Sequence, residues 1–248
     1  MLSPLYITMS SLVGTITFVL VTILYFFIRY KSNDDQVLTL IPWVYLILMT
    51  LINVAFNIST MNTLCDSANM SMILTSTVIP WILIFGSLVA LLNAFSGWKE
   101  PFSNTIGYIF VGNQAKRLMS EILVNKQSAN KDIAQSLEYI YNDKSALINE
   151  FTPDNFDTIF QKMQSSGIFQ SNVSDYKEKL RDLIKIKDLI ATGIWYLLAG
   201  FLVQTYGYYT IVSSGCPKTS SQMKLNERKY LNQLKQTAQK EKKVYVQQ

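Results

Sequence analysis

The sequence predicts an all-α membrane protein with about four transmembrane helices and a small helical domain inserted between the third and fourth spans. Four apolar stretches are long enough to cross a hydrocarbon core, which takes about 20 mostly apolar residues. Only 16% of the 248 residues are charged, against about 25% in soluble domains. The segment 96–188 is charged instead, and its apolar residues recur at helical spacing.

The first three spans lie within residues 1–95 and are joined by short loops. The apolar stretches run from about Leu5 to Ile28, from Val37 to Ile58 and from Met70 to Phe95. A buried helix of a soluble protein usually stops at about 10 to 14 apolar residues. The first stretch has no basic residue before it and is longer than the apolar part of a secretion signal. We therefore expect it to remain in the protein as a span.

The distribution of basic residues predicts the orientation. Arg29 and Lys31 follow the first stretch, whereas the loop "TMNTLCDSAN" after the second has neither Lys nor Arg. Short basic loops stay in the cytosol, so we expect 96–188 to be cytosolic and both chain ends to lie opposite. The tail, 217–248, has eight Lys and Arg against two Glu, which favours the other orientation for that segment. Short loops near the spans take precedence over late charges.

The second and third stretches resemble each other, as "IPWVYLILMTLINVAF" and "IPWILIFGSLVALLNAF". Repeated helices are typical of transporters, but Pro-Trp is also an ordinary start for a helix at a membrane surface. Neither stretch contains the charged residue that ion-coupled transport usually requires. We expect Asn53, Asn93 and Gln204 to form hydrogen bonds between helices.

The segment 96–188 has twelve basic and twelve acidic residues, a balance that favours a protein partner over nucleic acid. Thr152 with Pro153 predicts a helix start and Gly167 a left-handed helix end. We expect Ser174 to cap a last helix that continues into the fourth span. That span, 189–216, has its apolar stretch from Leu189 to Val212.

The residue types argue against catalysis. The chain has no histidine and only two cysteines, so it lacks the commonest general base and the set of ligands for a structural zinc ion. It has no glycine-rich phosphate-binding motif and no hydrolase or metalloprotease motif. We expect no enzyme activity, no catalytic residues, no metal and no cofactor.

The two cysteines are expected on the same side of the membrane. Cys65 lies in the second loop and Cys216 follows the fourth stretch. Under the four-span topology both face the non-cytosolic side, where a disulfide could form. The alternative is two free thiols.

The stretch "SGWKEPFSNTIGY", 96–108, follows the third span directly. Trp98 suits the aromatic belt of a membrane surface. Gly97 and Pro101 are expected to break the helix, and Ser103 and Asn104 to bond backbone groups in a turn or to cap the next segment. Phe102 and Tyr108, with Ile106, Ile109 and Phe110, predict an apolar ledge at the membrane surface. An ordinary interfacial turn with an anchoring aromatic residue is the simpler alternative.

Gly97 to Tyr108, "GWKEPFSNTIGY", resembles a signature of multi-spanning virion membrane proteins of nucleocytoplasmic large DNA viruses. The resemblance implies a minor capsid protein that lies in the inner virion membrane, beneath an icosahedral shell, and ties that membrane to the capsid lattice. It implies major and minor capsid proteins as partners, together with the lipid bilayer. It also implies assembly on a host membrane derived from the endoplasmic reticulum.

The favoured function is therefore a structural membrane protein that anchors a viral capsid to a membrane, with Trp98, Pro101, Phe102, Asn104 and Tyr108 as the contact motif. A small transporter or channel is the alternative, and a membrane enzyme is the least favoured class. No specific recognition of nucleic acid is expected. The basic tail could contact anions nonspecifically.

Overall fold

The protein is a multi-pass, all-α membrane protein, as the sequence predicts. Among the described residues of the computed structural model, four helices are long and apolar enough to cross a membrane. The one β feature of this part of the chain is an isolated antiparallel bridge between Leu123 and Phe169. The structure describes residues 4–32, 34–65, 68–124, 131–170, 172–216, 223–225 and 227–235. The expectation for the basic tail therefore falls largely outside the described residues.

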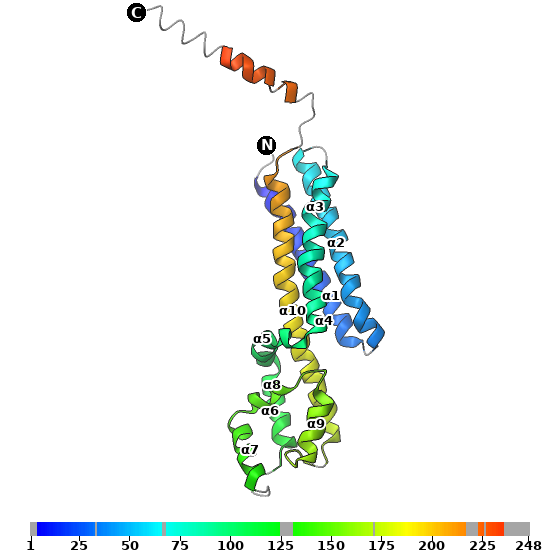
Figure 1. The fold of residues 1–248 in the computed structure, drawn as a ribbon, viewed down its shortest axis with the longest axis vertical. Helices are drawn as coiled ribbons and strands as arrows, with labels where there is room; N and C mark the ends of the chain where they lie inside the picture. Colours follow the sequence, from blue (N-terminus) through cyan, green and yellow to red (C-terminus); the bar gives the residue numbers. More distant parts are fainter. Residues whose placement is uncertain are drawn as a thin grey trace, which may run out of the picture.

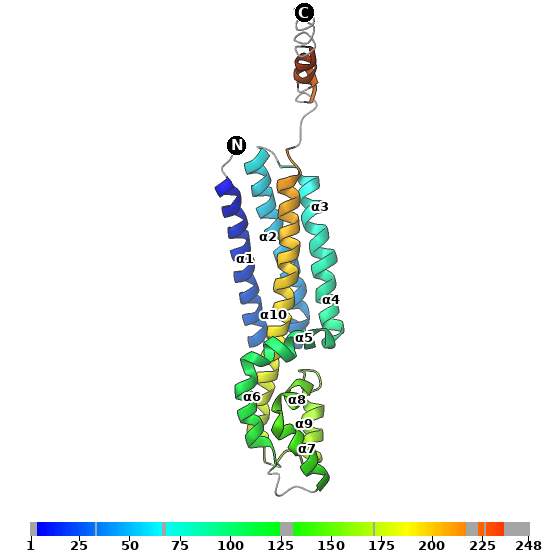
Figure 2. The same ribbon diagram turned by 90° about the vertical axis from the view of Figure 1, so that its left-hand side faces the viewer.

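The spanning helices form an elongated bundle that continues into the inserted domain at one end (Figures 1 and 2). The helices extend beyond the apolar stretches, because backbone hydrogen bonding does not stop where the side chains become polar. The third span contains a π-helical segment, η1, in its middle. The bundle consists of α1 (Pro4–Lys31), α2 (Asp35–Cys65), α3 (Met70–Pro80), η1 (Trp81–Gly86), α4 (Ser87–Ala94) and the upper part of α10 (Ser174–Ser213).

Helix α10 belongs to both parts of the molecule. It runs for 40 residues without interruption, about 60 Å at 1.5 Å per residue, whereas the hydrocarbon core is about 30 Å thick. The expected boundary between the inserted domain, 96–188, and the fourth span, 189–216, therefore falls inside one helix. Ser174 is the first residue of α10 and not the N-cap of that helix. Val173 occupies the N-cap position and forms no side-chain capping bond.

The inserted domain wraps short helices around the lower part of α10. Their apolar faces form one core that includes Met119, Ile148, Phe156 and Ile184. The elements are η2 (Ser96–Lys99), α5 (Glu100–Phe102), η3 (Ser103–Gly107), α6 (Tyr108–Ile122), α7 (Lys131–Asn142), α8 (Lys144–Glu150) and α9 (Phe156–Ser165).

The expected helix start at Thr152 and Pro153 is wrong, since α9 begins at Phe156. The Asn155 side chain accepts a hydrogen bond from the Thr152 amide at 2.8 Å, and the Thr152 hydroxyl accepts one from the Asn155 amide at 3.3 Å. This reciprocal pair holds the segment as a turn. Gly167 has φ 75°, so the left-handed helix end is confirmed.

The polar residues of the spans differ from expectation. Asn53 donates to the carbonyl of Met49 on its own helix, 2.9 Å away, and Asn93 is exposed. An amide bond between helices comes instead from Asn57, whose Nδ2 donates to Thr77 Oγ1 at 2.7 Å and joins α2 to α3. Asn53 and Asn57 are one turn apart on α2, and it is Asn57 that lies within reach of the Thr77 hydroxyl on α3.

The first turn of α1 and the last turn of α10 lie at one end of the bundle, and the inserted domain lies at the other (Figure 1). This arrangement predicts opposite labelling of two exposed tyrosines, Tyr139 in the domain and Tyr230 in the tail, when each is replaced singly by cysteine. The native cysteines are joined and do not react. In sealed vesicles, an impermeant maleimide should label only one of the two sites. Labelling of both from the same side would contradict a four-span topology.

Candidate functional site at the membrane junction

The chain turns sharply where the third span ends. Helix α4 ends at Ala94, and Phe95 is extended, with φ −133° and ψ 92°. The segment 96–107 then lies across α10 as a run of short helical pieces (Figure 2). Pro101 lies in the first turn of α5, where its missing N–H is not needed. The expectation that Pro101 breaks the helix is therefore wrong, because the break lies at Phe95.

Two aromatic residues of this segment hold Trp195 of α10. The Trp195 indole Nε1 donates to the carbonyl of Trp98 at 2.8 Å. The ring of Phe102 meets that of Trp195 edge to face, with centroids 5.0 Å apart, and the Trp98 ring lies 6.3 Å away. Trp98 remains 50% exposed. These contacts fix the segment to α10 at the level of the aromatic belt.

A largely buried ion pair lies about two turns of α10 closer to the domain than Trp195. Lys99 Nζ is 3.1 Å from Asp188 Oδ2, and the two side chains are only 12% and 13% exposed. Breaking a buried pair by removing one partner typically costs about 3 to 5 kcal/mol, because the other charge is left uncompensated. The pair therefore constrains how the segment sits on α10.

Lys187 connects three elements. Its ammonium donates to Asn104 Oδ1 in η3 and to the carbonyl of Ile148 in α8, each at 3.1 Å. The residue is 1% exposed. Gly107 lies against the same residue, since a Cβ at Gly107 would be 2.7 Å from the Lys187 carbonyl oxygen. The close approach of η3 to α10 therefore requires glycine at this position.

The expected apolar ledge is present only in part. Ile106, Ile109 and Phe110 are 38%, 75% and 70% exposed. Phe102 turns to Trp195 instead. Tyr108 packs partly buried against the core of the inserted domain, because it points to the inner face of α6. We call Ile106, Ile109 and Phe110 the apolar ledge from here on.

Cys65 and Cys216 lie at the opposite end of the bundle and are joined by a disulfide, with Cα atoms 5.1 Å apart. Gly215, with φ 68°, provides the left-handed turn between the end of α10 and Cys216. The bridge connects the end of the second span to the end of the fourth. It lies far from the motif segment and is no part of the junction (Figure 1).

The contacts of the junction join the segment 96–107 and α8 to α10. Within the described ranges, no group of three or more Cys, Asp and Glu residues could hold a metal ion. Lys187, Asp188 and Trp195 were not identified from the sequence, although Asp188 and Trp195 are seven residues apart and so share one face of a helix. No protein-family model, curated protein or solved structure matches the chain.

Burial lowers the pKa of Lys187 to about 8 from its ordinary 10.5, although neighbouring carboxylates, Asp188 first, act in the opposite direction. The residue lies just before Leu189, where the apolar stretch of α10 begins. Below pH 8 the lysine is charged in both the folded and the unfolded chain. Between about pH 8 and 10.5 the folded chain releases the proton while the unfolded chain keeps it. The free energy of unfolding should therefore rise with pH in this window.

This pH dependence is measurable as a rise in the melting temperature of the protein in nanodiscs between pH 7.5 and 9.5. A Lys187→Met variant should lose most of the rise, because its side chain does not titrate. An unchanged pH profile in the variant would assign the effect to another group.

Proposed function

We propose that the protein is a structural membrane protein that anchors an icosahedral viral capsid shell to the inner virion membrane. The observation that carries the proposal is the junction, where the segment 96–107 joins a helical domain to a helix that also spans the bilayer. The resemblance of Gly97–Tyr108 to a virion membrane protein signature supplies the viral context.

The geometry supports an anchor because the domain cannot swing freely. It is attached to the bundle through Phe95 and through the unbroken helix α10. Between these two connections, the Lys99–Asp188 pair and the hydrogen bonds of Lys187 hold the segment 96–107 and α8 against α10. A domain held in this way keeps a set distance from the bilayer, which is what a spacer between a membrane and a shell requires.

The apolar ledge is the proposed contact surface for a capsid protein. It is exposed next to the junction, and an exposed apolar surface of this kind commonly marks an interaction site. The remainder of the domain surface has balanced charge. Its partner would therefore recognise the ledge by shape and apolar burial, with charge having a smaller role.

Purified virus particles provide the test. The protein should be present in a fixed ratio to a capsid protein by quantitative mass spectrometry, and cross-links should join the two. An Ile109→Asp, Phe110→Asp variant should reduce the cross-links about tenfold or more, as loss of about 1.4 kcal/mol or more of binding energy requires. Tyr139→Asp, at a site that is 68% exposed in α7, is the matched control. A variable ratio, or equal cross-linking in both variants, would contradict the proposal.

A small transporter or channel is the second candidate. The likeness of the second and third spans favours it, as does a cavity inside the bundle that three amide side chains help to line. Ion or solute flux through the protein in reconstituted liposomes would support this candidate, and an impermeable bilayer would favour the anchor.

A further inference from the structure

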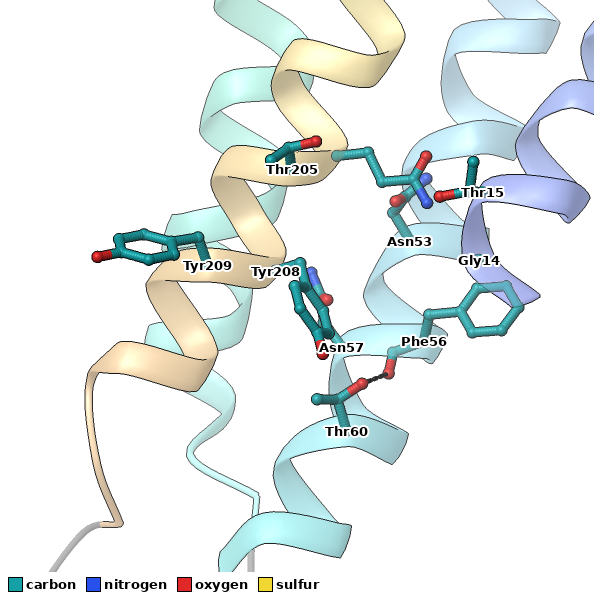
Figure 3. A pocket seen from close by; sticks show the side chains of 10 residues that line it. Gly14, Thr15, Asn53, Phe56, Asn57, Thr60, Thr205, Tyr208 and Tyr209 are labelled. Atoms are coloured by element: carbon teal, nitrogen blue, oxygen red, sulfur yellow. Dashed lines mark hydrogen bonds between the residues drawn. The ribbon is translucent and has the colours of Figure 1, made fainter. Parts of the chain in front are cut away.

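The bundle contains a cavity of about 330 Å³ between α1, α2 and α10. Its lining residues come from Gly14 and Thr15, from 53–60 and from 204–209 (Figure 3). The last two ranges lie near the ends of α2 and α10 that lead to Cys65 and Cys216, so the cavity is in the half of the bundle nearest the disulfide. A volume of this size is within the range of small-molecule sites, about 300 to 1,000 Å³.

Polar side chains line part of the cavity, although it lies within the spanning part of the bundle. Amide side chains line it from α2, at Asn53 and Asn57, and from α10, at Gln204. Gln204 Oε1 is buried and has no hydrogen-bond partner among the described residues. An unpartnered polar group inside a membrane costs several kcal/mol unless a ligand or water satisfies it. The cavity thus presents an acceptor that is ready for a hydroxyl donor.

Gly14 keeps the space beside this acceptor open. A Cβ at Gly14 would be 3.0 Å from Gln204 Nε2, so a larger side chain there would press on the amide. Figure 3 shows Gly14 and Thr15 on α1 across from Asn53 on α2. The smallest residue type on α1 therefore faces the amide of α10 at this level.

The lining residues indicate a neutral ligand that enters from the bilayer. None of them carries a charge, and a charged group at this depth without a partner is costly. At the outer edge of the cavity, Thr205 and Tyr209 are exposed on the bundle surface, Tyr209 by 70%. The opening of the cavity therefore faces the lipid acyl chains and not the water outside the membrane.

We propose that this cavity binds the hydroxyl head of a neutral lipid, of the diacylglycerol or sterol class. The lipid hydroxyl donates to Gln204 Oε1, and the amides of Asn53 and Asn57 surround the head. The apolar body of the lipid leaves the cavity past Tyr209 into the bilayer. This binding site is independent of the proposed anchoring role, because it lies in the opposite half of the bundle from the junction.

Photoreactive lipid probes test the proposal with the full-length protein in nanodiscs. One arm uses a photoreactive sterol, a second a photoreactive diacylglycerol, and a third a photoreactive phosphatidylcholine as the charged-head control. Peptides from 53–60 or 204–209 should be labelled by one or both neutral probes and much less by phosphatidylcholine. The neutral probe that labels these peptides identifies which class of neutral lipid the cavity binds.

Gln204→Leu should reduce this labelling about tenfold, as loss of one hydrogen bond of about 1.4 kcal/mol predicts. Gly14→Leu, which fills the cavity, should reduce it as strongly without changing any polar group. Thr17→Val is the matched control on α1, since Thr17 bonds the Val13 carbonyl and does not line the cavity. An intact disulfide in each variant checks the fold. Equal labelling in wild type and both cavity variants, equal labelling by phosphatidylcholine, or no labelling by either neutral probe would overturn the proposal.

Discussion

Replacing Gly107 with alanine is expected to lower the free energy of unfolding of the inserted domain by about 1 to 3 kcal/mol, the usual cost of overpacking. The new Cβ would be 2.7 Å from the Lys187 carbonyl oxygen and 3.0 Å from Lys187 Cγ. A backbone carbonyl within α10 cannot move aside, so η3 must shift away from the helix. That shift would lengthen the hydrogen bond between Lys187 and Asn104 and weaken the junction.

Gly97→Ala is the matched control within the same motif. The nearest atom to a Cβ at Gly97 is Glu100 Oε1, at an ordinary contact distance of 3.8 Å. Thermal unfolding and limited proteolysis in nanodiscs should distinguish the two variants. Gly107→Ala should melt at a lower temperature and expose the inserted domain to protease, whereas Gly97→Ala should behave like the wild type. Similar stability of the two variants would mean that the close approach of η3 to α10 does not matter.

The elements that the sequence predicts well are those determined by local pattern. Four apolar stretches predict four helices that could span a membrane, and these are present. Gly167 ends a helix in the left-handed conformation, because few other residues adopt it without strain. Both inferences need only neighbouring residues, which the sequence supplies directly.

The contacts of the junction depend on residues that are distant in the sequence. Lys99 and Asp188 are 89 residues apart, and their pairing follows only once α10 is known to pass beside the segment 96–107. The same limit explains the error over Asn53, because an amide within a span has several carbonyls and hydroxyls within reach. The sequence marks the motif as unusual, but its main contacts, Asp188 and Trp195, lie on α10, and no local pattern shows that this helix passes beside the motif.

Removal of the disulfide is expected to cost about 2 to 5 kcal/mol of stability, the usual range for a native bridge. Cys65 and Cys216 are 151 residues apart in the sequence. In the chain-entropy account, closing so long a loop restricts the unfolded chain by about 5 kcal/mol. A membrane keeps the spans helical in the unfolded state, so we expect a value in the lower half of the range. The double variant Cys65→Ser, Cys216→Ser should show the loss as a lower melting temperature in nanodiscs.

Reductant gives the matched comparison for this variant. It should lower the melting temperature of the wild-type protein to that of the double variant and leave the double variant unchanged. Protease resistance of the inserted domain should be retained in both, because the junction lies at the other end of the bundle and Gly207 still packs against Ser76 of α3. Loss of that resistance on reduction would show that the two ends of the molecule are coupled.

The bridge also predicts the orientation of the whole protein in the membrane. Disulfides persist in oxidising compartments and are rare in the cytosol, so an oxidised pair places the end with Cys65 and Cys216 on the non-cytosolic side. We therefore expect the inserted domain to be cytosolic, which agrees with Arg29 and Lys31 at its end of the first span. We expect alkylation of the purified native protein to modify neither thiol before reduction and both after it. Full modification without reductant would remove the bridge and, with it, the strongest argument for this orientation.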